Sequence, residues 1–231
     1  MLLKMAKKEV MVISLGGSVI VPNKIDIEFL KGFRKLIKSY LRKYKFIIIA
    51  GGGKTARDYQ QAARSVVRLD PEDVDWIGIH STRLNGHLLR TIFRDVAKPA
   101  LAKNPSKKIK LEKVLIAAGW EPGRSTDYDA VMLAKTFGAK TVINITCIDY
   151  LHDKDPRQYK DAKKIEVIDW KGFRKIVGDK WDPGMNVPFD PVASKLAQTN
   201  KMKLVLIGRD LDNLRNVLDK RPFKGSIVQD K

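Results

Sequence analysis

Three glycine-bearing segments contain the residues of this 231-residue chain that are best suited to chemistry. Each follows a short apolar run and precedes a stretch of helical pattern: Leu15–Ser18, Gly51–Lys54 and Gly119–Thr126. Glycine lets backbone N–H groups approach phosphate oxygens because no Cβ stands in the way. A helix that begins directly afterwards adds free donors and a partial positive charge. The three segments therefore predict an anion site of the kind that binds phosphate.

Basic residues strengthen this interpretation of the second segment. Lys54 and Arg57 lie in the first turn of the helix expected after Gly53, where the helix dipole gives a cation no advantage. A bound anion explains their position. None of the segments has the G-x-x-x-x-G-K-[ST] spacing of a P-loop. The alternative is that the glycines only make tight turns, but three such segments, two of them with Lys or Arg, favour a phosphate site.

The elements that position these segments alternate between short apolar runs and longer stretches of helical period. The expected strands are Val10–Leu15, Phe46–Ala50, Val114–Ala118, Thr141–Ile145, Leu204–Ile207 and a short one near Ile227. The first expected helix contains Phe29 to Tyr44, and the second begins near Lys54. Two more cover Asp75–Val96 and Thr126–Phe137, another begins at Asp190, and the last covers Leu211–Leu218. This order predicts an α/β fold with a mostly parallel sheet and helices on both faces. The glycine segments then meet at the carboxyl edge of the sheet, where such folds bind ligands.

Composition narrows the classes of partner and site. Lys and Arg number 45 against 26 Asp and Glu, a net charge of +19 that favours anionic partners. The single cysteine, Cys147, excludes an intramolecular disulfide framework, and three histidines make a His-based metal cluster improbable. This cysteine usage is typical of the reducing cytoplasm, where we expect the protein. No apolar run approaches the roughly 18 residues of a membrane helix.

The motifs, taken in order along nearly the whole chain, resemble the amino acid kinase family. They are Ser14–Val19, Gly51–Tyr59, Ile79–Asn85, Pro122–Asp127, Ile145–Asp149 with Asp155-Pro156, and Asp190–Lys195. Within that family they are most similar to the archaeal-type uridylate (UMP) kinases. The resemblance implies a three-layer αβα sandwich forming one domain over 1–231, with an acceptor-side lobe over about 1–139 and an ATP-side lobe over about 140–231. It also implies transfer of the γ-phosphoryl group of ATP to UMP, giving UDP and ADP, with Mg²⁺.

The same resemblance assigns roles to individual residues. The transferring phosphoryl group is expected at Gly16, Gly17 and Ser18, with Lys54, Asp127, Asp190 and Lys195 as further catalytic candidates. UMP is expected to contact Gly52, Gly53, Arg57, Asp75, Gly119, Ser125 and Thr126, with Arg57 on the phosphate and Asp75 on the ribose. ATP is expected to contact Ser14, Gly17, Thr146, Asp149, His152 and Asp155. Asp127 matches the residue that organises the active-site cations, and we expect Mg²⁺ to be held mainly by phosphates and water, with Asp190 as a possible protein contact.

Several positions depart from the family pattern or admit another role. Ser14 stands where many members have Lys, so Lys54 or Lys195 is the candidate substitute, although Lys195 also fits a solvated helix face. Tyr150 replaces a glycine of the nucleotide loop, and Tyr128 and Asp129 replace small residues. Thr126 is the expected N-cap, and capping-box spacing offers a purely structural role for Asp129. Trp120 suits base stacking or packing, and Cys147 is expected to be a small buried residue.

The expected partners are ATP, UMP and further copies of the chain, in a hexamer built from dimers to which the long helix from Asp75 contributes. Neither nucleic acid nor membrane is expected as a partner. Two other functions stay open from sequence. One is a kinase of the same fold acting on another small phosphate or carboxylate, such as isopentenyl phosphate. The other is a catalytically silent protein that binds nucleotide or polyanion through its positive surface.

Overall fold

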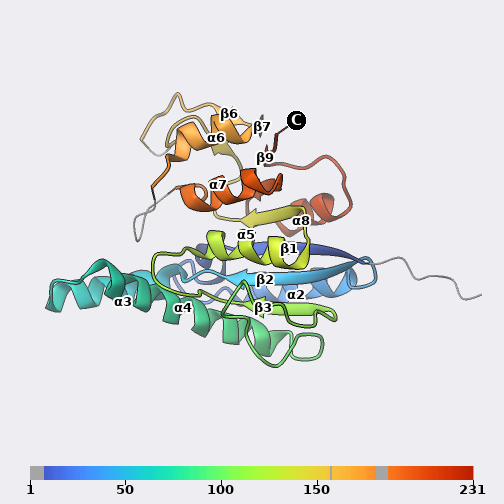
Figure 1. The fold of residues 1–231 in the computed structure, drawn as a ribbon, viewed down its shortest axis with the longest axis horizontal. Helices are drawn as coiled ribbons and strands as arrows, with labels where there is room; N and C mark the ends of the chain where they lie inside the picture. The colour runs from blue at the N-terminus through green and yellow to red at the C-terminus, as the bar shows by residue number, and fades with distance from the viewer. Residues whose placement is uncertain (1–7, 157, 181–186, 231) are drawn as a thin grey trace, which may run out of the picture.

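The structure, a computed structural model, describes residues 8–156, 158–180 and 187–230 and has an α/β fold (Figure 1). The strands are β1 Glu9–Leu15, β2 Tyr44–Ala50, β3 Val114–Ala117, β4 Thr141–Ile145, β5 Leu151–His152, β6 Lys164–Ile165, β7 Val167–Ile168, β8 Lys203–Ile207 and β9 Ser226–Val228. The helices are α1 Gly17–Ile20, α2 Ile27–Ser39, α3 Gly53–Val66, α4 Pro71–Ile92, α5 Thr126–Phe137, α6 Trp170–Val177, α7 Pro191–Thr199 and α8 Leu211–Leu218.

The main sheet has seven strands in the order β3-β2-β1-β4-β8-β9-β7. Neighbouring strands are parallel except β8 and β9, which are antiparallel, so the predicted mostly parallel sheet is confirmed. The chain runs outward from β1 through β2 to β3, and β4 then lies on the other side of β1. The strand order therefore reverses between β1 and β4, and a crevice for ligands forms at such a point.

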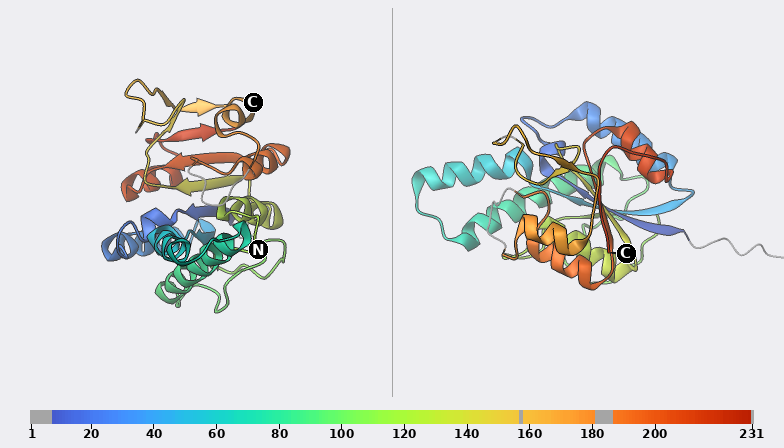
Figure 2. Two further views of the ribbon diagram at one scale, coloured as in Figure 1. Left: turned by 90° about the vertical axis from the view of Figure 1, so that its left-hand side faces the viewer. Right: turned by 90° about the horizontal axis from the view of Figure 1, so that it is seen from above.

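Helices cover both faces of this sheet, as the side view in Figure 2 shows. Successive residues of β1 explain why, because Met11, Ile13 and Leu15 belong to one buried cluster and Val12 belongs to the other. The first cluster contains side chains of α2, α4 and α8, and the second contains side chains of α5, α6 and α7. Two apolar layers on one sheet make the three-layer αβα arrangement that was predicted.

Helix boundaries differ from expectation mainly at α2 and α4. The first helix was expected to include Tyr44, but α2 ends at Ser39 and Tyr44 is the first residue of β2. The expected helix over Asp75–Val96 begins four residues earlier, at Pro71, and ends at Ile92. Proline suits the first turn of a helix because the N–H it lacks would have no partner there. The expected bounds of α5, α8 and β4 agree with the structure. The helix after Gly53 is also found, beginning at Gly53 itself.

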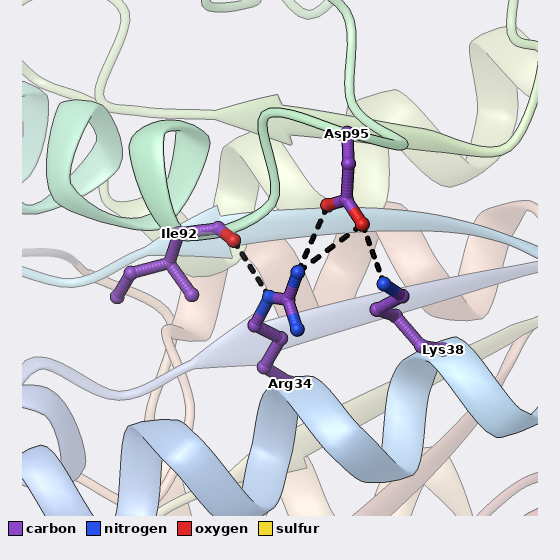
Figure 3. A network of polar contacts seen from close by, with 4 residues as sticks. All are labelled: Arg34, Lys38, Ile92 and Asp95. Carbon is purple, nitrogen blue, oxygen red and sulfur yellow. Dashed lines mark hydrogen bonds and ion pairs between the residues drawn. The ribbon is translucent and has the colours of Figure 1, made fainter.

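A polar network ties the C-terminal end of α4 to α2 (Figure 3). Arg34 donates from Nε to the carbonyl of Ile92 at 2.8 Å and from Nη2 to Asp95 at 3.1 and 3.2 Å, and Lys38 donates to the same carboxylate. The hydrogen bond from Lys38 and the charge of Arg34 hold the pKa of Asp95 below its usual value. Because Arg34 also satisfies a carbonyl of the last turn, the network fixes the helix whose middle part supports the site.

Candidate active site

The first two glycine segments pack directly against each other at the carboxyl ends of β1 and β2. A Cβ on Gly17 would overlap the backbone of Gly53, and a Cβ on Gly51 would overlap the backbone of Gly17. Gly53 also has a φ of +64°, and a Cβ there would overlap the carbonyl of Gly17. These glycines are therefore required by close backbone packing, whether or not a ligand is bound.

The same packing leaves backbone donors unused at one place. In the part of the chain that the structure describes, the N–H groups of Gly17, Ser18, Gly52 and Gly53 have no hydrogen-bond partner. They lie at the starts of α1 and α3, where the first N–H groups of a helix have no carbonyl within the helix to bond. Two adjoining helix starts with free donors can bind the oxygens of an anion.

Side chains of helix α4 form hydrogen bonds with the second and third glycine segments. The buried Asn85 donates from Nδ2 to the carbonyls of Gly51 at 2.8 Å and Gly52 at 3.0 Å. The buried Thr82 accepts from the N–H of Gly119 at 2.8 Å. These side chains were recognised only as part of the Ile79–Asn85 motif and not as site residues. The sequence feature that could have identified Thr82 and Asn85 is the run of polar residues in this motif, on a helix that also contributes residues to the core.

Four side chains from distant parts of the chain form a carboxyl network beside the first glycine segment. Ser14, buried in β1, donates to Asp127 Oδ1 at 2.9 Å. The N–H of Asp190 lies 3.4 Å from Asp127 Oδ2, and Ser125 donates to Asp190 Oδ2. Asp127 and Asp190 were expected in one site, and the structure brings them together. Ser14, which stands where the family resemblance led us to expect a lysine, binds the carboxylate of Asp127 and supplies no charge.

The environment of Asp127 alters its protonation. Burial is the main reason that the pKa of Asp127 is raised to about 7, and the negative charge of Asp190 contributes in the same direction. The hydrogen bond from Ser14 opposes this change. A carboxyl group that titrates near neutral pH is typical of a functional site.

The start of α5 differs from the prediction. Ser125, and not Thr126, is the N-cap, because its Oγ accepts from the N–H of Tyr128 at 3.1 Å. Capping is therefore ruled out for Asp129, whose Oδ2 instead accepts from the N–H of Trp120 at 3.0 Å. The capping prediction was wrong by one residue, since Ser125 and Thr126 are adjacent residues that can both cap a helix.

The residues expected at the acceptor lie on α3, α4 and the start of α5. Gly52 and Gly53 begin α3, and Arg57 is exposed one turn further along. Asp75 accepts from the N–H of Gly123 at 2.7 Å and so contacts the third glycine segment. Thr126 is the first residue of α5 and is half-buried. The acceptor residues are thus spread around the third glycine segment and the start of α3.

Of the residues expected at ATP, Ser14 lies in β1 and Gly17 begins α1. The others follow β4, on the other side of β1. Thr146 donates its N–H to the carbonyl of Ile207 at 3.0 Å, and a side chain on Gly208 would overlap the carboxylate of Asp149. His152 is in β5, and Asp155 follows it in the same loop. Cys147 is exposed, so its expected burial was wrong. The strand ends at Ile145, which leaves Cys147 in the loop.

The two lysine candidates are separate from the carboxyl network. Lys54 forms an ion pair with Asp58 one turn further along α3, at 2.5 Å. Lys195 is exposed on α7, and no ion pair within the described residues involves it. Neither lysine contacts Asp127 or Asp190 in this structure.

Comparisons with known proteins agree with this geometry. The amino acid kinase family matches residues 9–208. A uridylate kinase of Thermoplasma volcanium is 36% identical, covering 96% of this chain and 99% of that protein, and one of Thermococcus sibiricus is 32% identical, covering 94% and 98%. The crystal structure of uridylate kinase from Archaeoglobus fulgidus is similar with a TM-score of 0.81 and 29% identity, covering 94% of this chain and 99% of that one. The glycine segments, the carboxyl network and these similarities together show that the chain belongs to the amino acid kinase family.

Proposed function

We propose that this protein is a UMP kinase, which transfers the γ-phosphoryl group of ATP to UMP and releases UDP and ADP. The observation that carries the proposal is the pair of adjoining helix starts, at Gly17 and Gly53, which have free N–H groups. Asp127 is hydrogen-bonded to Ser14, in the strand that leads into the first of these helix starts. Full-length similarity to uridylate kinases of Thermoplasma volcanium and Thermococcus sibiricus supports the choice of substrate.

Phosphoryl transfer requires alignment of two phosphate chains and neutralisation of their charge, without a covalent nucleophile. We assign the phosphate of UMP to the N–H groups of Gly52 and Gly53 and to Arg57, whose guanidinium suits a phosphate geometrically. The transferring phosphoryl group lies at Gly17 and Ser18, directly beside them. Because a Cβ on either Gly17 or Gly53 would overlap the other segment, the two phosphate positions are adjacent and held at a fixed separation.

Mg²⁺ accompanies ATP in this proposal, and the residues present fit it. Asp127 and Asp190 offer carboxylate oxygens, which magnesium prefers. Within the described residues no group of three or more His, Cys, Asp and Glu is arranged to hold a metal, so phosphate oxygens and water would complete its coordination. When bound, the ion neutralises negative charge on the phosphates. Asp127, fixed by Ser14 and the N–H of Asp190, is held in place for that contact.

The division into two sides is also part of this proposal. The acceptor side comprises about residues 1–139 and the ATP side about 140–231, with the crevice between β1 and β4 as their boundary. Thr146, Asp149, His152 and Asp155 then face the adenosine of ATP, and Asp75 and Thr126 face the UMP nucleoside. We place the reaction in the cytoplasm. None of the described helices is long and apolar enough to cross a membrane.

We also propose that the chain forms a homo-oligomer through α3 and α4, by resemblance a hexamer built from dimers. Figure 1 and the right-hand view of Figure 2 show α3 reaching beyond the rest of the molecule beside α4. Helix α3 contains no buried residue, and it presents Tyr59 at 68% exposure and Val66 at 82%. Light scattering of the purified protein tests this, with a monomeric mass as the contrary result.

The proposed activity is tested by ADP release in a coupled assay with UMP, CMP, dTMP and AMP as acceptors. Turnover should be highest with UMP and should require Mg²⁺. Isopentenyl phosphate and a small carboxylate extend the panel to the alternative acceptors. Absence of turnover with every nucleotide, or a higher kcat/KM for isopentenyl phosphate than for UMP, would contradict the proposal.

A further inference from the structure

Asp129 is a buried carboxyl group that the mechanism above does not use. It has 1% of its surface exposed and lies in the first turns of α5, followed by the buried apolar residues Ala130 and Val131. Its Oδ2 accepts from the N–H of Trp120, and its Oδ1 has no partner among the described residues. Burying a carboxyl group costs free energy that an aliphatic residue of similar size would not. A buried group with one hydrogen bond therefore calls for a specific role.

The hydrogen bond of Asp129 is one of several by which helices α4 and α5 fix the loop Gly119–Arg124. Helix α4 holds the preceding peptide groups, since Thr82 accepts from Gly119 and Arg83 donates to the carbonyls of Gly119 at 3.3 Å and Trp120 at 2.8 Å. The N–H of Trp120 is held from the opposite side, by α5. At the other end of the loop the N–H of Gly123 is held by Asp75. Each half of the loop is thus fixed by side chains from helices.

We propose that Asp129 is a positioning residue for the acceptor nucleotide: through the N–H of Trp120 it fixes the loop Gly119–Arg124 to the helix that also carries Thr126 and Asp127. The inference rests on the proposed function, because that loop and Thr126 form the acceptor side. One helix then sets the position of Asp127 relative to the loop. Trp120 is held at both its N–H and its carbonyl, with a half-exposed indole on the loop.

The charge environment agrees with a role in which Asp129 is a hydrogen-bonding group and not a charge. The pKa of Asp129 is raised to about 8, mainly by burial. The charges of Glu121 and Asp190 also raise it, whereas the hydrogen bond from Trp120 and the charge of Arg124 lower it. The N–H of Trp120 can bond to this side chain in either protonation state, so the proposed role depends on the hydrogen bond and not on the charge. A neutral carboxyl group accepts from an N–H through its carbonyl oxygen, as the side-chain amide of asparagine also does.

Two substitutions separate this role from simple packing. Asp129→Asn keeps an acceptor for Trp120, whereas Asp129→Val fills the space without one. We expect Asp129→Val to raise the KM for UMP at least fivefold with less than a twofold change in the KM for ATP, and Asp129→Asn to restore the KM for UMP to within twofold of the wild type. Lys135→Ala, on the exposed face of the same helix, is the matched control and should leave both values unchanged.

Amide hydrogen exchange measured on the ligand-free protein tests the positioning without enzyme turnover. Exchange at Trp120 should be at least tenfold faster in Asp129→Val than in the wild type and unchanged in Asp129→Asn. The proposal is overturned by wild-type exchange or a wild-type KM for UMP in Asp129→Val, by equal increases in both KM values, or by an Asn variant that behaves like the Val variant. If the wild type phosphorylates no nucleotide, only the proposed function is contradicted. Exchange at Trp120 then still decides whether Asp129 holds the loop.

Discussion

The loop on the acceptor side and the loop on the ATP side are held in different ways. Gly119–Arg124 is fixed by side chains of α4 and α5, of which Thr82 and Asp129 are buried. The loop after β4 is held largely by its own hairpin: β5 pairs with β6, Asp153 and Lys163 exchange hydrogen bonds, and Lys154 pairs with Asp161. Leu151 adds one buried contact, donating its N–H to Ser226 Oγ at 2.8 Å.

This difference has a consequence for the two substrates. A loop held by buried side chains from two helices has one well-defined position, so the acceptor side is preformed and sensitive to single substitutions. A loop held by exposed ion pairs and a two-residue ladder depends less on any one contact, because exposed pairs contribute little. The following predictions test this contrast, beginning with the largest effect.

Asp127→Asn should reduce kcat roughly 100- to 1,000-fold, the usual cost of removing one preorganised electrostatic group from an active site. The fold should be retained, since asparagine can still accept from Ser14. Steady-state kinetics with UMP and ATP measure the effect, and Asp212→Asn on the exposed face of α8 is the control. A loss of less than tenfold would mean that the carboxyl network serves structure and not turnover.

Gly53→Ala should lower the free energy of unfolding by about 3 kcal/mol or more, because left-handed backbone strain of about 1–2 kcal/mol adds to the overlap with Gly17. Gly138→Ala provides the comparison: Gly138 has a φ of +72° but nothing within 4 Å of an added Cβ. Gly138→Ala should lower the free energy of unfolding only by the backbone strain, about 1–2 kcal/mol. Denaturant unfolding of both variants measures the difference, and equal losses would argue against the close packing of the two segments.

Arg57→Ala should raise the KM for UMP about 10- to 100-fold, corresponding to the loss of charge-assisted hydrogen bonds worth about 1.5–3 kcal/mol. The KM for ATP should change little. Arg64→Ala, an exposed arginine further along α3, is the matched control for the loss of one positive charge. An unchanged KM for UMP in Arg57→Ala would place the acceptor phosphate elsewhere.

Asp129→Asn should flatten the dependence of stability on pH. Because the pKa of Asp129 is about 8 in the folded protein and near 3.8 when unfolded, the folded state binds the proton more tightly. The wild type therefore loses stability as pH rises from about 4 to 8, while this contribution is absent in the variant. When the free energy of unfolding of the ligand-free proteins is measured at pH 5 and pH 8, the variant should be more stable relative to the wild type at pH 8 than at pH 5. A constant difference between the two proteins would contradict the raised pKa.

Asp161→Asn should have the smallest effect. It removes the exposed ion pair with Lys154 in the ATP-side hairpin, and the KM for ATP should change less than twofold. A tenfold increase would show that this hairpin depends on single contacts after all, and the contrast between the two loops would fail.

The sequence was sufficient for six of the seven strands of the main sheet, most of the helices and the glycine segments, because apolar periodicity and glycine placement are local signals. It did not predict the two-residue edge strand β7 or the four-residue helix α1, which are too short to show a period. It was insufficient where a residue acts through a distant one. Ser14 looked like a missing lysine until its contact with Asp127, 113 positions away, was visible. Asp129 fitted a capping box by spacing, yet its partner is the backbone of Trp120. Local spacing does not contain such pairings, which arise when α5 packs beside β1 and the loop after β3.

A crystal structure with UMP and a non-hydrolysable ATP analogue tests the central claim most directly. We predict phosphate oxygens of UMP about 3 Å from the N–H of Gly53 and from the Arg57 guanidinium, with the terminal phosphate of the analogue at Gly17. A UMP phosphate bound away from these groups, or the two nucleotides on separate faces of the molecule, would contradict the account.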